Sequence, residues 1–198
     1  MHHGLVPYLV PLDSVRAFWG CHQPALVARV RDRFRSEIQD NEVVVRQEIA
    51  AGAPTLDRAL EELSAGTAAA TAHGGQYASA IELLCAHYGE LLPNDHVYPI
   101  DRAWLRKELD PILQRWNIAH LVGSDRMIGG NWPLPIPAPR DLPLGGTLEL
   151  DAILHAAHTM RTTPPPELRG NAIPVIGQIR QWLETAVARQ LSIVFFYY

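Results

Sequence analysis

Residues 192–198 have the sequence SIVFFYY, and this stretch decides the fold. Most of its residues are β-branched or aromatic, types that favour a strand. Ile193 to Phe196 form an unbroken apolar run instead of alternating with polar residues. Such a run is typical of a strand that is buried on both faces. We therefore predict a strand here that has no face in water.

A second apolar stretch, Leu5 to Leu12, also has the character of a strand. Pro7 has no N–H to donate to a neighbouring strand, which confines it to a sheet edge or a strand end. Both apolar stretches are too hydrophobic to remain as isolated strands in contact with water. We therefore expect the two to pair in one small mixed sheet.

The residues between these strands have the periodicity of helices. Leu26, Val30, Phe34 and Ile38 recur every four residues and would lie along one helical face. Further helices are expected over residues 56–65, 76–92, 102–116, 147–161 and 171–190. The pattern predicts a helix-rich α+β fold, organised as one domain over residues 1–198 with a Pro/Gly-rich segment at 129–146.

The composition excludes several classes of protein. Apolar residues make up 47% of the chain and charged residues 19%, with a formal net charge of −4. This balance is that of an ordinary globular protein, and it gives no electrostatic attraction to nucleic acid or to a membrane. No apolar run approaches the roughly 20 residues that span a bilayer. Residues 4–12 lack the cationic flank of a signal peptide, so we expect a cytoplasmic protein.

Two cysteines, Cys21 and Cys85, are too few and too isolated for a disulfide framework or a zinc site. The sequence also lacks the common catalytic and phosphate-binding motifs, and we expect no cofactor. The absence of these motifs favours a protein without catalytic activity, although it does not exclude an enzyme.

The segment Pro133 to Pro139 has the sequence PLPIPAP, with a proline at every second position. Recognition of polyproline helices requires a period of three, so this segment is not such a ligand. In an extended chain, the prolines would lie on one side and Leu134, Ile136 and Ala138 on the other. A rigid connector, an edge strand and a partner-binding segment all fit this pattern.

Asp151, His155 and His158 form the best polar constellation in the sequence. On a helix they lie within about 60° of one another, so three possible metal ligands share one face. The opposite face carries apolar residues, among them Ile153 and Met160. The constellation is either a solvated face or a metal or catalytic site, and the first interpretation is favoured because it points away from the core.

A second group, His96, Tyr98 and Asp101, lies in the loop that leads into the helix containing Trp104. Loops beside rigid helices often carry function. Asp101 is also well placed to cap that helix, because Asp favours the N-cap position. The structural role and the functional role both remain open for this loop.

The favoured function is therefore binding of another macromolecule, with another protein as the expected partner. Trp132 and Arg140 flank the rigid proline segment and are the expected binding residues, because aromatic and Arg side chains dominate many interfaces. Holding them rigidly would lower the entropic cost of docking. The alternative is a small enzyme or ligand-binding domain that uses the His155/His158 face or the His96–Asp101 loop.

Three segments resemble a known group of bacterial proteins. They are GLVPYLVPLDSVR at 4–16, LDRALEELSAG at 56–66, and SIVFFYY at 192–198. Together they are similar to an uncharacterised, actinobacterial-type family of domains of unknown function, the YfbM-like group. The resemblance implies an α/β or α+β domain and supplies no catalytic residues. It also implies an accessory or immunity-like protein, of the kind found beside toxin or contact-competition genes.

Overall fold

The computed structural model has an antiparallel sheet at its centre. Within residues 3–140 and 142–198, which the structure describes, four strands form one sheet in the order β2-β1-β4-β3. The strands are β1 (Leu5–Val10), β2 (Glu90–Leu91), β3 (Leu144–Leu148) and β4 (Ser192–Tyr197). Asp141, within the Pro/Gly-rich segment at 129–146, lies outside the described residues.

The pairing of the two terminal strands is confirmed. Leu5 lies opposite Tyr197 and Val10 opposite Ser192, so β1 and β4 pair along their whole length. The expectation of a mixed sheet is wrong, because all three pairings are antiparallel. The reason lies in the connection between β3 and β4. Two packed helices, α11 (Leu150–Thr162) and α12 (Ala172–Arg189), return the chain to the sheet end that it left.

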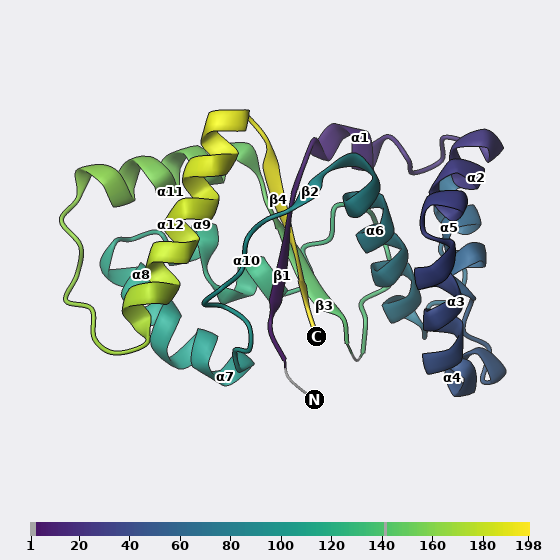
Figure 1. Cartoon of the computed structure of the whole chain (residues 1–198), viewed down its shortest axis with the longest axis horizontal. Helices are drawn as coiled ribbons and strands as arrows, with labels where there is room; N and C mark the ends of the chain where they lie inside the picture. Colours follow the sequence, from purple (N-terminus) through teal and green to yellow (C-terminus); the bar gives the residue numbers. More distant parts are fainter. Residues whose placement is uncertain (1–2, 141) are drawn as a thin grey trace.

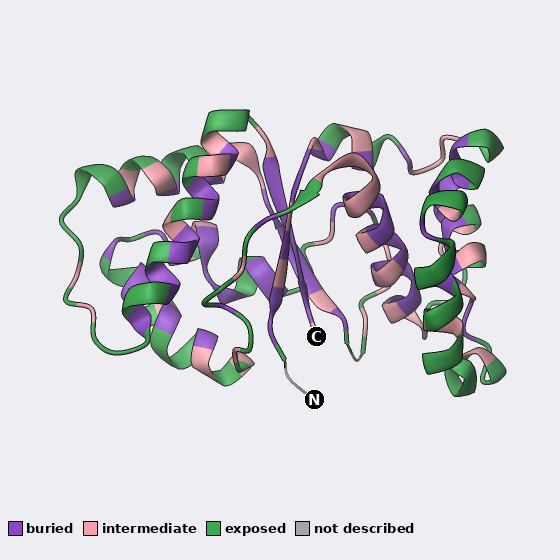
Figure 2. Cartoon of the chain, in the orientation of Figure 1, coloured by how far each residue is buried: buried purple, intermediate pink, exposed green. Residues whose placement is uncertain are grey.

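Strand β4 has no face in water, as its apolar run predicts, and all six of its residues are buried. Ile193, Phe195 and Tyr197 belong to one hydrophobic cluster, whereas Val194 and Phe196 belong to another. Because successive side chains of a strand point to opposite faces, β4 contributes to a core on each side of the sheet. Figure 1 shows the helices in two groups with the sheet between them, and Figure 2 shows the buried strands at the centre.

The helical layer on one side is built from the first half of the chain. Its helices are α1 (Leu12–Arg16), α2 (Pro24–Arg33), α3 (Arg35–Val44), α4 (Arg46–Ala50), α5 (Leu56–Ser64) and α6 (Gly74–Tyr88). The predicted apolar repeat from Leu26 to Ile38 is buried throughout, although Phe34 separates α2 from α3. Thr55 caps α5 by accepting a hydrogen bond from the Arg58 N–H at 3.2 Å.

The opposite layer contains α7 (Arg102–Trp104), a π-helical turn η1 (Leu105–Leu109), α8 (Asp110–Arg115), α9 (Ala119–Val122), α10 (Ser124–Ile128), α11 and α12. Trp182 of α12 packs on Phe195 with ring centroids 5.8 Å apart, and its indole N–H donates to the Pro93 carbonyl at 2.6 Å. This contact fixes α12 against the sheet and against the chain that follows β2. None of the helices in the described residues is both long and apolar enough to span a membrane.

The helix that we predicted over residues 147–161 begins three residues later, because Thr147 belongs to β3. The strand was missed because two of its five residues are glycines, which weaken a strand signal. The glycines are required by close packing. A Cβ on Gly146 would lie 2.1 Å from the Arg126 carbonyl oxygen, and one on Gly145 would lie 2.4 Å from the Phe195 carbonyl oxygen.

The outer edges of β1 and β3 are bonded to neighbouring loops. Beside β1, the Leu5 N–H donates to the Val97 carbonyl at 3.3 Å and the Pro7 carbonyl accepts from the Leu92 N–H at 2.9 Å. Beside β3, the Gly145 carbonyl accepts from Gly130 at 2.8 Å. Pro7 thus lies inside β1 rather than at its end, and β2 is too short to pair with it.

Phe195 is fully buried, so its replacement by alanine tests the central role of β4. We expect Phe195→Ala to lower the free energy of unfolding by about 3–5 kcal/mol, because it removes a large side chain from the core next to Trp182. Urea unfolding followed by circular dichroism measures this change. The control is Leu154→Ala on α11, where the side chain is 40% exposed and a change below about 0.5 kcal/mol is expected. Equal effects of the two substitutions would contradict this account of the core.

Candidate functional site

The Asp151, His155 and His158 side chains lie on the exposed face of α11. Asp151 Oδ1 accepts a hydrogen bond from the neighbouring Ala152 N–H at 2.8 Å. Across the described part of the chain, no three His, Cys, Asp or Glu side chains are grouped as metal ligands would be. This placement corresponds to the solvated face that the helical periodicity favoured.

His96 and Asp101 occupy exposed positions in the loop before α7. Asp101 Oδ1 accepts a hydrogen bond from the Ala103 N–H at 2.5 Å, so Asp101 caps this short helix. Neither residue lines a cavity among those found in the described residues. The loop therefore contributes a cap and does not converge with other functional side chains.

The two predicted binding residues are placed differently. Trp132 is half-buried, and its ring packs on Phe196 with centroids 5.7 Å apart. It also lies against β3, since a Cβ on Gly145 would approach its ring to 2.4 Å. Arg140 is exposed and lines a cavity. The structure thus brings Arg140, but not Trp132, to that cavity.

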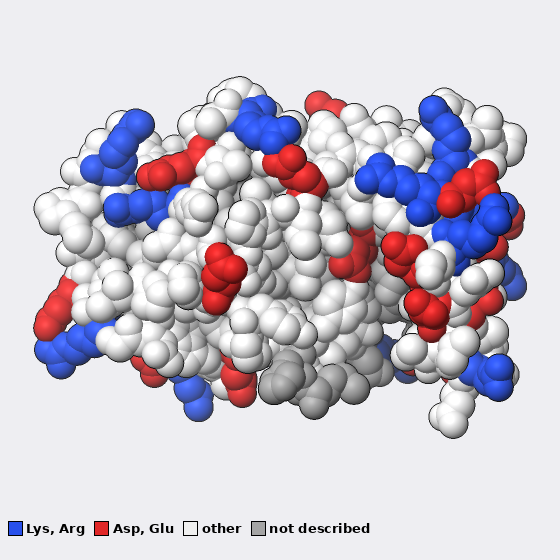
Figure 3. Space-filling model, viewed as in Figure 1, with Lys and Arg blue, Asp and Glu red and all other residues white. Residues whose placement is uncertain are grey.

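This cavity, called the α3–α6 cavity below, has a volume of about 610 Å³. One wall is formed by Asn41 and Val44 of α3, Glu48 of α4, and Val45 between the two helices. Their spacing of three, four and seven residues from Asn41 places them along one helical face. In Figure 3 the molecule is hollowed at the lower right, where Figure 1 shows α3 and α4 standing away from α6.

The opposite wall combines segments that are distant in sequence. It is lined by Gly75, Gln76 and Ser79 of α6, by Arg102, by Arg140 and 142–144, and by Tyr198. The proline segment reaches this wall because it packs directly on the first turn of α6. A Cβ on Gly74 would lie only 2.2 Å from the Pro137 carbonyl oxygen, so this position requires glycine. The segment is therefore a connector that is held against the helix and delivers Arg140 to the cavity.

Gln76 is the most informative side chain of the α3–α6 cavity. It is only 3% exposed, yet its Oε1 has no hydrogen-bond donor among the described residues. Asn41 Oδ1, on the facing wall, is also buried without a donor in the described chain. Leaving a buried acceptor unpaired costs about 1–3 kcal/mol, so such atoms need an explanation.

The cavity also contains charges that the rest of the described protein does not pair. Arg102 Nε is buried without an acceptor, and Arg140 forms no ion pair with any described residue. The same holds for the carboxylate of Glu48. Guanidinium groups bind carboxylates and phosphates strongly, through paired hydrogen bonds. The arrangement can therefore hold an oxyanion.

A half-buried carboxylate, that of Glu82, lies behind one side of the cavity. Tyr8 of β1 donates its hydroxyl to Glu82 Oε1 at 3.1 Å, and the Tyr198 hydroxyl donates to Glu82 Oε2. Burial raises the pKa of Glu82, and burial together with the nearby carboxylate raises the pKa of both phenols. These hydrogen bonds join β1 and the end of β4 to α6. They also hold Tyr198 in place where it lines the cavity.

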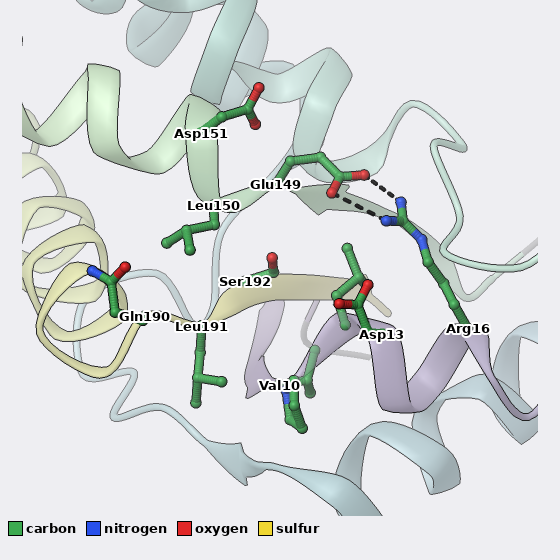
Figure 4. A pocket seen from close by; sticks show the side chains of 11 residues that line it. Val10, Asp13, Arg16, Glu149, Leu150, Asp151, Gln190, Leu191 and Ser192 are labelled. Carbon is green, nitrogen blue, oxygen red and sulfur yellow. Dashed lines mark hydrogen bonds and ion pairs between the residues drawn. The ribbon is translucent and has the colours of Figure 1, made fainter.

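A second cavity of about 340 Å³ lies where β1 and β3 end and β4 begins. Figure 4 shows Arg16 of α1 reaching across it to the carboxylate of Glu149, with Asp13 and Asp151 nearby. Here the cation is already paired, which leaves less unsatisfied binding capacity than in the α3–α6 cavity. We therefore take the α3–α6 cavity as the candidate site.

Of the residues in the candidate site, sequence reasoning found Arg140 and missed Gln76, Asn41 and Arg102. The sequence pattern of α6 does contain a signal for Gln76. It lies four residues before Ala80 on the apolar side of α6, where a polar side chain is unusual. Asn41 and Arg102 carry no comparable signal, because only the tertiary fold brings them to the cavity.

The raised pKa of Glu82 predicts how stability depends on pH. The folded state retains this proton to higher pH than the unfolded chain, so wild-type stability falls as pH rises above the ordinary value of 4.5. Relative to wild type, Glu82→Gln should therefore become more stable as pH rises from 4 to 8. Urea unfolding at each pH measures the difference. Glu184→Gln, at an exposed position of α12, is the control for the removal of one carboxylate from the protein.

Comparisons with known proteins give one match. A family model described as "Domain of unknown function (DUF7691)" matches residues 1–198. Neither the curated proteins nor the solved structures contain a match to this chain. Because the family model covers the whole sequence, the chain belongs to the DUF7691 family of domains of unknown function.

Proposed function

We propose that this protein binds a small anionic ligand in the α3–α6 cavity. The observation that carries the proposal is the unpartnered amide oxygen of Gln76, which is buried in the wall of a cavity of about 610 Å³. Ligand sites commonly have this volume and combine apolar walls with a few converging polar groups. A ligand with a suitable donor would relieve the cost of burying the oxygen.

The charge of the ligand follows from Arg102 and Arg140. Both line the cavity, and neither forms an ion pair with a described residue. The Ser79 hydroxyl lines the same wall and can donate a further hydrogen bond. Two guanidinium groups and a hydroxyl favour a carboxylate or a phosphate.

The lining residues favour binding over catalysis. Of the residue types that act as nucleophile or proton carrier, the described cavity wall contains Ser79, Glu48 and Tyr198, but no described His, Cys or Lys lies there beside Ser79. The nearby hydroxyl of Tyr198 already donates to Glu82. A binding role therefore requires nothing beyond the groups that line the cavity.

A second candidate function is the one that the sequence resemblance implied, an accessory or immunity-like protein that binds another protein. The observation that favours it is the exposure of Val43 and Val44, at 69% and 82%, beside the cavity. Exposed apolar groups near an unpaired Arg140 are suited to a protein interface. If this function holds, Val43→Ser should weaken the association with the partner and leave small-anion binding unchanged, because Val43 does not line the cavity.

Replacing Gln76 by methionine separates a binding role from a structural one. Gln76→Met keeps a similar volume and removes the unpartnered oxygen, so the free protein should gain about 1 kcal/mol in its free energy of unfolding. Ligand binding should weaken in the same variant. The matched control is Gln114→Met at an exposed position of α8, where little change is expected. Marked destabilisation by Gln76→Met would show that the amide serves the fold instead.

Anion binding can be measured directly with propionate and with inorganic phosphate. We expect titration to shift the backbone amide NMR signals of Gly75, Gln76 and Ser79, with affinity falling about tenfold or more in Arg140→Gln. Arg115→Gln removes an exposed arginine on α8, outside the cavity, and should leave the affinity unchanged. Shifts that are absent, or that are equal in Arg140→Gln and wild type, would contradict the proposal.

A further inference from the structure

We infer that the ligand of the α3–α6 cavity carries an amine as well as an anionic group, and is an α-amino acid or a short peptide with free termini. This inference rests on the proposed function, because it specifies the ligand of the same site. The observation behind it is that the cavity holds unpaired acceptors alongside its unpaired cations.

Three acceptors in the cavity wall need donors. Asn41 Oδ1 and Gln76 Oε1 are buried without donors among the described residues, and the Glu48 carboxylate has no ion-pair partner there. A simple carboxylate has no hydrogen to give them and would be repelled by Glu48. An ammonium group carries three N–H donors and a positive charge, which matches two amide oxygens and one carboxylate.

The acceptors lie on the α3–α4 wall and on α6, whereas the cations come from other segments. Arg102 begins α7, and Arg140 follows the proline segment. The cations and the unpaired acceptors of the site are thus supplied by different parts of the chain. A ligand that bears a carboxylate and an ammonium group on one short frame can satisfy both sets at once.

The apolar lining indicates the kind of side chain. Val44, Val45 and Leu142 face the cavity alongside the polar groups. Contact with these residues would stabilise an aliphatic side chain by about 25 cal/mol for each Å² of apolar surface that it buries. The cavity volume of about 610 Å³ accommodates more than a single residue. An aliphatic amino acid or a dipeptide of such residues is therefore the class that fits.

A matched set of compounds tests this inference by isothermal titration calorimetry at pH 7. L-leucine carries both charges, 4-methylpentanoate lacks the amine, 3-methylbutylamine lacks the carboxylate, and N-acetyl-L-leucine has an uncharged nitrogen. We expect L-leucine or L-leucyl-L-leucine to bind at least tenfold more tightly than each of the other three. Which of these two binds more tightly distinguishes a free amino acid from a peptide.

Substitution of Glu48 provides the matched protein variant. Glu48→Gln should lower the affinity for the tighter of the two zwitterions about tenfold, and leave the affinity for 4-methylpentanoate unchanged or increased, because the residue acts on the amine. Glu184→Gln on α12 is the control and should change neither affinity. Circular dichroism and a thermal melt of each variant establish that it is folded, and Glu48 is exposed, so its replacement should not disturb the core.

The outcomes separate this inference from the proposed function. If 4-methylpentanoate binds as tightly as the zwitterions, or if Glu48→Gln weakens both classes equally, the amine-binding role is overturned while anion binding stands. The same conclusion follows if propionate or phosphate binds at the cavity and none of the leucine series does. If no compound of either set binds, the inference and the proposed function both fall.

Discussion

The architecture follows from one constraint, that β4 is apolar on both faces. A strand of this kind cannot lie on the surface, because each face must be removed from water by a separate core. Phe195 is covered by α12 on one side and Phe196 by Trp132 and the first helical layer on the other. The helices must therefore divide into two layers, and β4 must lie inside the sheet, between β1 and β3.

The first layer also contains the α3–α6 cavity. Helix α6 is joined to the sheet through Glu82, whose carboxylate accepts hydrogen bonds from the hydroxyls of Tyr8 and Tyr198. Helix α3 lies beyond α6 and packs on α5, and α4 packs on α3. The α3–α6 cavity lies between α3–α4 and α6, and α5 joins its two walls because it packs on both α3 and α6. This arrangement allows unpaired polar groups to collect there without weakening the central cores.

The sequence predicts those parts of the structure that depend on local patterns. The unbroken apolar run at 193–196 identifies β4, and Thr55 and Asp101 are the helix caps that their residue types indicate. Strand β3 could not be predicted, because Gly145 and Gly146 are required by close contacts with backbone atoms that are distant in the sequence. A local sequence pattern contains no information on such contacts. The cavity could not be predicted from the sequence for a related reason. Its residues come from α3, α4, α6, α7, the chain that follows the proline segment, and Tyr198, and only long-range packing assembles them.

The loop hydrogen bonds beside β1 and β3 have a consequence for how the protein associates with other chains. An incoming strand extends a sheet by pairing with free backbone groups at its edge. Here the chain around residues 92–97 occupies the edge of β1, and residues 130–131 occupy that of β3. These contacts occupy part of the backbone on the outer sides of β1 and β3, which limits the places where an incoming strand can pair.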